Sequence, residues 1–168
     1  MRLREAVPGD AEAVAAFHVA VWRETYAGIA PKVAFDTLDA ARRLPGWQAR
    51  LGDTQPGTVL SEDDDGIAGL VSWGAPGEAL FEARGEIKHL YVANRARRQG
   101  LGARLLEVAR QGIAGAGFDG AGLAVVRENA AAIAFYRALG GREAGAFTDP
   151  GPLWKSDNIL MVWPDLDP

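Results

Sequence analysis

The segment Arg97-Arg98-Gln99-Gly100-Leu101-Gly102 has the residue types and the spacing of a phosphate-binding site. It lies between an expected strand, residues 85–93, and an expected helix that begins near Gly100. The first turn of a helix has unpaired main-chain N–H groups and a partial positive charge, and glycine lets an anion approach them without an obstructing Cβ. Arg95, Arg97 and Arg98 add positive charge. The segment therefore predicts a pocket for a phosphate or pyrophosphate; the alternative is an ordinary turn with solvated arginines.

Two widespread phosphate motifs do not describe this segment. A P-loop needs Lys followed by Ser or Thr after its second glycine, where this chain has Ala103-Arg104. A dinucleotide-binding fingerprint needs a third glycine, where this chain has Leu105. The predicted phosphate site is therefore of neither kind.

Candidate groups for proton transfer lie on an expected helix, residues 129–139, and on the 85–93 strand. Asn129 and Tyr136 are seven residues apart, nearly two helical turns, so both side chains project toward one side. Strand alternation places Glu86 and Lys88 on one face unless a bulge rotates one of them away. His89 has an imidazole, which titrates near neutrality. The alternatives are that Tyr136 serves only packing, that Glu86 and Lys88 form a solvated pair, and that His89 is structural.

The helices and strands expected from the sequence predict one mixed α/β domain over residues 1–168. Their order mixes hairpins with strand-helix-strand crossovers, which favours a mixed sheet over a wholly parallel one. Expected strands cover residues 2–6, 58–61, 67–73, 85–93, 122–126, 143–148 and 159–163. Expected helices cover residues 11–26 with Asp10 as N-cap, about 31–51, a stretch from about 100 and residues 129–139.

The composition of the chain argues against several classes of binding partner. The 168 residues are 24% charged and 48% hydrophobic, as in average soluble proteins. The 18 Lys and Arg against 22 Asp and Glu give a net charge of −4, which argues against a nucleic-acid partner. Cysteine is absent and the two histidines lie far apart in the sequence, so we expect neither a thiolate nucleophile nor a metal. No run of about 20 apolar residues and no signal-peptide core is seen, which predicts a cytoplasmic protein without a membrane partner.

Two motifs together resemble the GNAT superfamily of N-acetyltransferases. Arg97-x-x-Gly100-x-Gly102 behind the strand Glu86-Ile87-Lys88-His89-Leu90-Tyr91-Val92 is similar to its acetyl-coenzyme A signature. The run from Val125 to Gly140 resembles the strand-helix motif that follows, in matching order and spacing. The resemblance covers about Glu86 to Gly141, roughly a third of the chain. One departure is Gly141, where the family often has an aromatic residue.

The resemblance implies the GNAT fold, a splayed, mostly antiparallel mixed sheet flanked by helices. In that fold a bulge parts the 85–93 strand from the next parallel strand, and the pantetheine arm of acetyl-CoA enters the gap. Tyr136 would protonate the departing thiolate, Glu86 would act as base with His89 as its rival, and the N–H of Leu90 would hold the oxyanion. The cofactor-binding residues implied in this way are Leu90, Tyr91, Val92, Arg97, Arg98, Gln99, Gly100, Leu101, Gly102, Ala103, Asn129 and Phe135.

The function implied is direct transfer of acetyl from acetyl-CoA to a primary amine of a small molecule or a peptide or protein. Trp22-x-x-x-Tyr26-x-Gly28 resembles a segment of small-molecule and peptide N-acetyltransferases, so Trp22, Tyr26 and Trp154 are predicted to line the acceptor site, although Trp22 also fits the core. A competing hypothesis is an acyl-CoA-binding sensor or regulatory module without turnover, and another acyl group could replace acetyl. The sequence leaves open the acceptor amine and whether the final strands form a homodimer.

Overall fold

The computed structural model describes residues 1–53 and 57–164, and within them seven strands form one sheet in the order β1-β2-β3-β4-β5-β7-β6. All neighbouring strands are antiparallel except β4 and β5, so the predicted mixed, mostly antiparallel sheet is confirmed. The strands are β1 (Arg2–Glu5), β2 (Thr58–Asp63), β3 (Gly66–Gly74), β4 (Gly85–Val92), β5 (Ala121–Val126), β6 (Arg142–Asp149) and β7 (Ser156–Trp163). The α-helices are α1 (Ala11–Tyr26), α2 (Lys32–Thr37), α3 (Ala40–Gly52), α4 (Leu101–Gly115) and α5 (Ala130–Ala138).

Most predicted elements are present, and the main difference is the stretch 31–51. It forms two helices, because the chain leaves helical geometry at Leu38 and Asp39. The side chain of Asp39 then caps α3 by accepting a hydrogen bond from Arg42 N at 2.7 Å. Among the described residues, no helix has both the length and the apolar character that crossing a bilayer requires.

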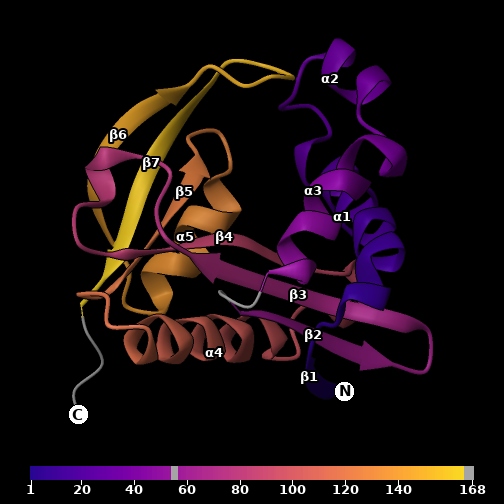
Figure 1. Ribbon diagram of the computed structural model, residues 1–168. Coiled ribbons are helices and arrows are strands. Elements are labelled where there is room, and N and C mark those ends of the chain that lie inside the picture. The colour runs from indigo at the N-terminus through magenta and orange to yellow at the C-terminus, as the bar shows by residue number, and fades with distance from the viewer. Residues whose placement is uncertain (54–56, 165–168) are drawn as a thin grey trace.

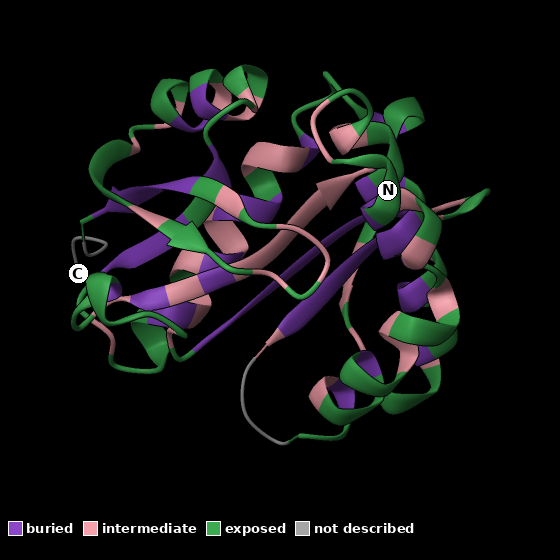
Figure 2. Cartoon of the chain, turned by 90° about the horizontal axis from the view of Figure 1, so that it is seen from above, coloured by how far each residue is buried: buried purple, intermediate pink, exposed green. Residues whose placement is uncertain are grey.

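Helices cover both faces of the sheet, and the strand residues alternate between them (Figure 1). Val59 and Val71 pack in the core under α4 and α5, whereas Leu60 and Leu70 pack against α1 and α3. Figure 2 shows the central strands largely buried and much of the helix surface exposed. The sheet therefore has two hydrophobic layers, one on each side.

Helix α4 lies very close to strand β3, which fixes where the helix starts relative to the sheet. A Cβ on Gly112 would lie only 2.2 Å from Cζ2 of Trp73, and one on Gly69 would lie 2.8 Å from Cδ1 of Leu105. Both contacts require glycine because neither neighbouring side chain has room to move far in a packed core. The first turn of α4 is thereby held beside the end of β4.

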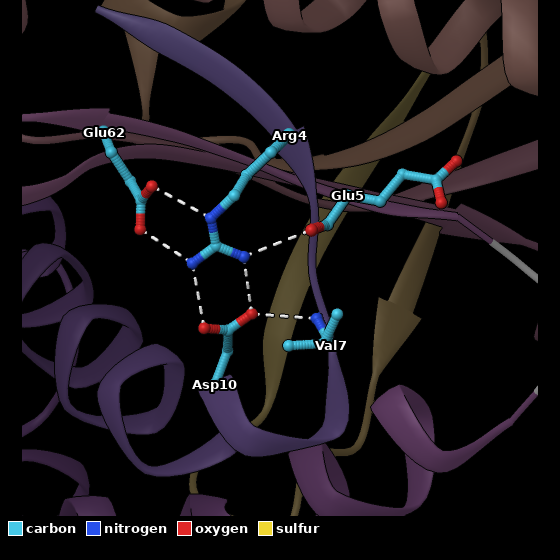
Figure 3. A network of polar contacts seen from close by, with 5 residues as sticks. All are labelled: Arg4, Glu5, Val7, Asp10 and Glu62. Atoms are coloured by element: carbon cyan, nitrogen blue, oxygen red, sulfur yellow. Dashed lines mark hydrogen bonds and ion pairs between the residues drawn. The ribbon is translucent and has the colours of Figure 1, made fainter.

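A network around Arg4 joins the start of α1 to strands β1 and β2 (Figure 3). The guanidinium of Arg4 donates to both carboxylate oxygens of Glu62 and to both of Asp10, at 2.7 to 2.9 Å. Asp10 directly precedes α1 as predicted, but its carboxylate accepts from Val7 N at 2.8 Å instead of from the first turn of the helix. The Arg4 hydrogen bond is the main cause of the lowered pKa of Asp10. The network therefore anchors α1 to the sheet through half-buried charges.

Strands β4 and β5 pair at two positions only and then separate. The partners are Gly85 with Ala121 and Glu86 with Gly122. Beyond them β4 continues to pair with β3, and β5 continues to pair with β7. In Figure 1 strands β5, β7 and β6 run at a steep angle to β2 and β3. The predicted splayed sheet is thus present.

A bulge at Lys88 accompanies this separation. Ser72 lies opposite His89 and Trp73 lies opposite Ile87, so Lys88 is an extra residue on β4. As a result Ile87 and Leu90, three residues apart, both pack in the α4 core. The bulge predicted for this strand is confirmed, and it changes which residues face each layer.

Acid should destabilise the protein through His18. This side chain is 2% exposed, and its Nδ1 accepts a hydrogen bond from Trp47 Nε1 at 3.0 Å, which requires an unprotonated nitrogen. Burial, with a further contribution from Arg43, lowers the pKa of His18 from 6.5 to about 3. The folded state therefore binds fewer protons than the unfolded state below pH 6.5, so stability is complete above that pH and falls toward pH 3. We expect the free energy of unfolding to fall by roughly 2 kcal/mol between pH 6.5 and pH 5.

Urea unfolding at a series of pH values measures this effect, with His18→Gln as the comparison. The variant should show a shallower dependence of the unfolding free energy on pH, because one of the groups that must remain neutral is gone. Parallel curves for the two proteins would contradict the role of His18.

Candidate functional site

A cavity of about 560 Å³ lies where β4 and β5 separate. Both strand edges line it, with residues 87–92 on one side and 123–125 on the other. Helices α1 and α5 and the start of α4 complete its walls with Val21, Glu24, Thr25, Tyr26, Arg97, Arg98, Gly102, Asn129, Ala131, Ala132, Phe135 and Tyr136. The cavity therefore brings together both sequence motifs and the end of α1.

The main chain of β4 offers hydrogen-bonding groups to this cavity. Ala93 N, one residue past the end of β4, donates to Ala68 O of β3 at 2.9 Å. Because successive residues of a strand direct their N–H groups to opposite sides, Leu90 and Val92 direct theirs toward the separated β5. Buried main-chain groups need partners, and an extended molecule with its own amides could supply them like an added strand.

One end of the cavity is built to hold an anion. Gly100 has a φ of +77° and ends the loop as the N-cap of α4, a conformation that favours glycine. Within the described residues, the main-chain N–H groups from Arg98 to Ala103 donate no hydrogen bond. Arg97 and Arg98 line the cavity beside them, and Arg97 Nε donates to Val92 O at 3.1 Å. Open amides, a helix N-terminus and two cations together fit a diphosphate.

Other side chains of this loop point away from the cavity. Arg95 binds Asp63 instead, with Nη2 to Oδ1 at 2.9 Å, so its charge does not serve the anion site as predicted. Gln99 Nε2 donates to Arg95 O at 3.0 Å, and Leu101 is 2% exposed in the core. The side chains of Gln99, Leu101 and Ala103 do not line the cavity. The cofactor contacts predicted for these three residues would therefore have to come from their main-chain groups.

Helix α5 and its N-cap contribute Asn129, Phe135 and Tyr136 to the wall, and the seven-residue spacing of Asn129 and Tyr136 does direct both toward one side. Asn129 Oδ1 accepts from Ala132 N at 3.2 Å and so caps the helix. A Cβ on Gly102 would lie 3.0 Å from Cζ of Phe135, so α4 and α5 are in close contact here. The two motifs therefore meet across the cavity.

Tyr136 is held by an aromatic contact and remains a neutral phenol. It is 8% exposed, and its ring meets that of Trp163 edge-on at a centroid distance of 5.8 Å. Trp163 Nε1 donates to Leu139 O at 3.0 Å, and a Cβ on Gly141 would lie 2.7 Å from its Cζ2. Trp163 thus fills the corner where the family often has an aromatic residue at position 141. Burial chiefly, with Tyr26 adding to it, raises the pKa of Tyr136, so the phenol keeps its proton at neutral pH.

The two candidate bases differ in their access to the cavity. Glu86 Oε2 accepts from Gly77 N at 2.8 Å and from Lys88 Nζ at 2.9 Å, and Glu86 lies outside the cavity lining. His89 lines the cavity, and its Nδ1 lies 2.7 Å from Ser72 Oγ. Burial chiefly, followed by the nearby His18 and cationic side chains, lowers the pKa of His89 well below 6.5. His89 is therefore neutral at pH 7, with an imidazole available to accept a proton.

The three aromatic residues predicted for the acceptor site lie together, but only Tyr26 lines the main cavity. Trp22 is 5% exposed, and its ring centroid lies 5.7 Å from that of Trp154 and 5.3 Å from that of Tyr26. Trp154 lines a separate cavity of about 660 Å³ that also includes Asp157. Trp22 therefore supports the other two from the core.

Comparison with known proteins identifies the family. Residues 19–140 match the acetyltransferase (GNAT) family. The chain belongs to the GNAT acetyltransferase family.

Relatives of this GNAT chain extend over almost its whole length. It is 28% identical over 167 residues to an uncharacterized N-acetyltransferase, YuaI, from Bacillus subtilis (strain 168), which covers 98% of this chain and 93% of YuaI. Its fold is similar to that of a ribosomal-protein-alanine N-acetyltransferase from Brucella melitensis, with 23% identity, a TM-score of 0.70 and coverage of 98% and 99%. It is also similar to the structure of yncA from Salmonella typhimurium with its cofactor acetyl-CoA, with 21% identity, a TM-score of 0.70 and coverage of 100% and 95%.

Some cavity residues of this GNAT chain were not predicted. Val21, Glu24 and Thr25 face the cavity from α1, whereas the sequence analysis considered only the aromatic residues of that helix. Little in the sequence indicated these three residues. Val21 and Thr25 have helical spacing, but a polar end of a helix that lines a cavity has the same sequence pattern as one that faces solvent. Glu24 brings a carboxylate to the cavity, whereas the predicted Glu86 lies outside its lining.

Gly102→Glu should block binding of acetyl-CoA. The new side chain would press on Phe135 and would place a negative charge beside the open amides of α4. We expect isothermal titration calorimetry to give at least a tenfold higher Kd for acetyl-CoA, about 1.4 kcal/mol. Gly115→Glu is the matched control, because it adds the same residue to the other end of α4, where no atom lies within 4 Å of a Cβ. Equal affinities for the two variants would contradict the assignment of the anion site.

Proposed function

We propose that this protein transfers the acetyl group of acetyl-CoA directly to a primary amine. The observation that carries the proposal is the cavity between the separated strands, with the open amides of α4 at one end and Tyr136 in its wall. Membership in the GNAT acetyltransferase family supports acyl transfer as the reaction class. The similar fold of yncA, whose structure contains acetyl-CoA, supports acetyl-CoA as the donor.

The residues of the cavity suit the parts of this donor. The amides of a pantetheine arm would pair with the main chain of Leu90 and Val92 in the gap left by β5. The pyrophosphate would meet the N–H groups of residues 98–103 and the side chains of Arg97 and Arg98. Phe135 and Asn129 would flank the arm from α5. The pyrophosphate of the donor would then lie beside groups of opposite charge.

Direct transfer assigns a role to four groups. The amine nitrogen attacks the thioester carbonyl carbon, a C–N bond forms, and the resulting oxyanion accepts a hydrogen bond from Leu90 N. The tetrahedral intermediate collapses with cleavage of the C–S bond, and the thiolate takes the phenolic proton of Tyr136. The proton lost by the ammonium nitrogen passes to His89 or Glu86, and exchange with solvent then restores both side chains. The chain lacks cysteine, so no thiol is available to carry the acetyl group between the two substrates.

Tyr136→Phe tests whether the protein is a catalyst or only a sensor of acyl-CoA. The substitution removes the proton donor but keeps the ring that packs on Trp163. We expect kcat for acetyl transfer to fall at least tenfold, about 1.4 kcal/mol, while the Kd for acetyl-CoA changes less than twofold. Release of free coenzyme A with a panel of amines measures the first quantity, and calorimetry measures the second. An unchanged rate with intact binding would refute the role of Tyr136, and no turnover with any amine would favour the sensor.

A second comparison separates the two candidate bases. We expect His89→Gln to lower kcat more than Glu86→Gln does, because His89 lines the cavity while the Glu86 oxygen is engaged by Gly77 and Lys88. Any fall in rate that protonation of His89 causes should lie well below pH 6.5, because burial lowers the pKa of this imidazole, and it should be absent from the His89 variant. A larger loss in the Glu86 variant would instead identify Glu86 as the base.

A further inference from the structure

A second, smaller cavity of about 240 Å³ lies against the other face of β4, between α1 and α3. It is strongly basic, because the described residues that line it include three arginines and no acidic residue. The lining residues are His18, Arg42, Arg43, Gly46, Trp47, Arg50 and His89. Arg43, Trp47 and Arg50 follow helical spacing on α3, so one face of that helix supplies most of the wall.

The guanidinium of Arg43 lacks the partners that a buried cation normally has. Its Nε is buried and has no hydrogen-bond partner among the described residues. Burial lowers the pKa of both Arg43 and Arg50, but only Arg50 has carboxylates, Glu86 and Asp53, that oppose the effect. Arg43 as a whole is half-buried, and a half-buried cation without a counter-charge among its described neighbours costs free energy that a bound anion would recover. The cavity therefore has the composition of a binding site for a small anion.

His89 connects this basic cavity to the donor cavity, because it lines both. Its neighbours Leu90 and Tyr91 line the donor cavity, and Leu90 is the residue expected to meet the thioester oxygen. A molecule that extended past His89 would have one end in the basic cavity and the other near the acetyl group. The larger cavity at Trp154 does not favour an anion in this way, because it is lined by both acidic and basic residues, Glu128, Asp157 and Lys155.

We propose that the acceptor is a small amine that also carries a carboxylate, as an amino acid does, and that Arg43 and Arg50 bind that carboxylate. This inference rests on the proposed acetyl transfer and specifies its substrate class. The planar guanidinium of Arg43 supplies paired N–H donors for a carboxylate, and Trp47 and His18 shape the wall around it. Binding of the carboxylate would leave the amine directed past His89 toward the thioester.

Paired acceptors test the proposal with the intact protein. Each of the common L-amino acids is compared with its primary amide, which keeps the amine and the side chain but removes the negative charge. Release of free coenzyme A gives kcat and KM for each compound. We expect at least one amino acid to have a KM at least tenfold lower than that of its amide.

Substitution of Arg43 then assigns the effect to the basic cavity. Arg43→Gln should raise the KM of the preferred amino acid at least tenfold, leave the KM of its amide within twofold, and leave the Kd of acetyl-CoA unchanged. Arg43→Lys should recover part of the preference, because it retains the charge. Arg142→Gln is the matched control, since it removes an exposed arginine from β6 and should alter neither KM. Arg50→Gln provides the same comparison should Arg43→Gln fail to fold.

The outcomes separate this inference from the function on which it rests. Amides used as well as their acids, or an Arg43→Gln variant with an unchanged KM for the acid, would overturn the carboxylate site while acetyl transfer stands. Absence of coenzyme A release with every member of the panel, although acetyl-CoA binds, would overturn both.

Discussion

The separation of β4 from β5 after Glu86 is the constraint on which the rest of the structure depends. A sheet gains by pairing every strand edge, so leaving two edges unpaired in the middle of the molecule is unfavourable unless something else pairs with them. The bulge at Lys88 bends β4 away, while β3 and β7 keep pairing with the outer edges of the two strands. The cost is thus confined to one gap between the two strands, where a thioester donor would be held.

Burial sets the protonation states of the ionisable side chains in this gap. In its middle, burial keeps the phenol of Tyr136 and the imidazole of His89 neutral, which are the forms needed to give and to take a proton. Arginine side chains lie in two other places, with Arg97 and Arg98 beside the start of α4 and Arg43 and Arg50 behind β4. Proton transfer and anion binding are therefore separated in space although they share one strand.

Much of this arrangement could be predicted from short-range sequence patterns. The spacing of Gly100 and Gly102 and the two-turn spacing of Asn129 and Tyr136 depend on local helix geometry, which the sequence encodes directly. The engagement of Glu86 with Gly77 and of Arg95 with Asp63 depends on contacts between segments distant along the chain, which no spacing reveals. The basic face of α3 did have a helical signal, but three arginines on a helix usually lie in solvent. Only the contact of Trp47 on α3 with His89 on β4 shows that these arginines line a cavity.

The corner between α5 and β7 has a consequence for how the sequence of this protein can change. The ring of Trp163 occupies the space over Gly141 and also supports Tyr136. An aromatic residue at 141 would collide with that ring, and a small residue at 163 would leave an empty space behind the phenol. The side chains at positions 141 and 163 therefore compete for the same space. During evolution the two positions should change together, because a sequence with only one of the two changes would be either overpacked or left with a cavity. Substitutions in the C-terminal strand β7 should therefore depend on substitutions in the donor-binding motifs, although the two segments are far apart in the sequence.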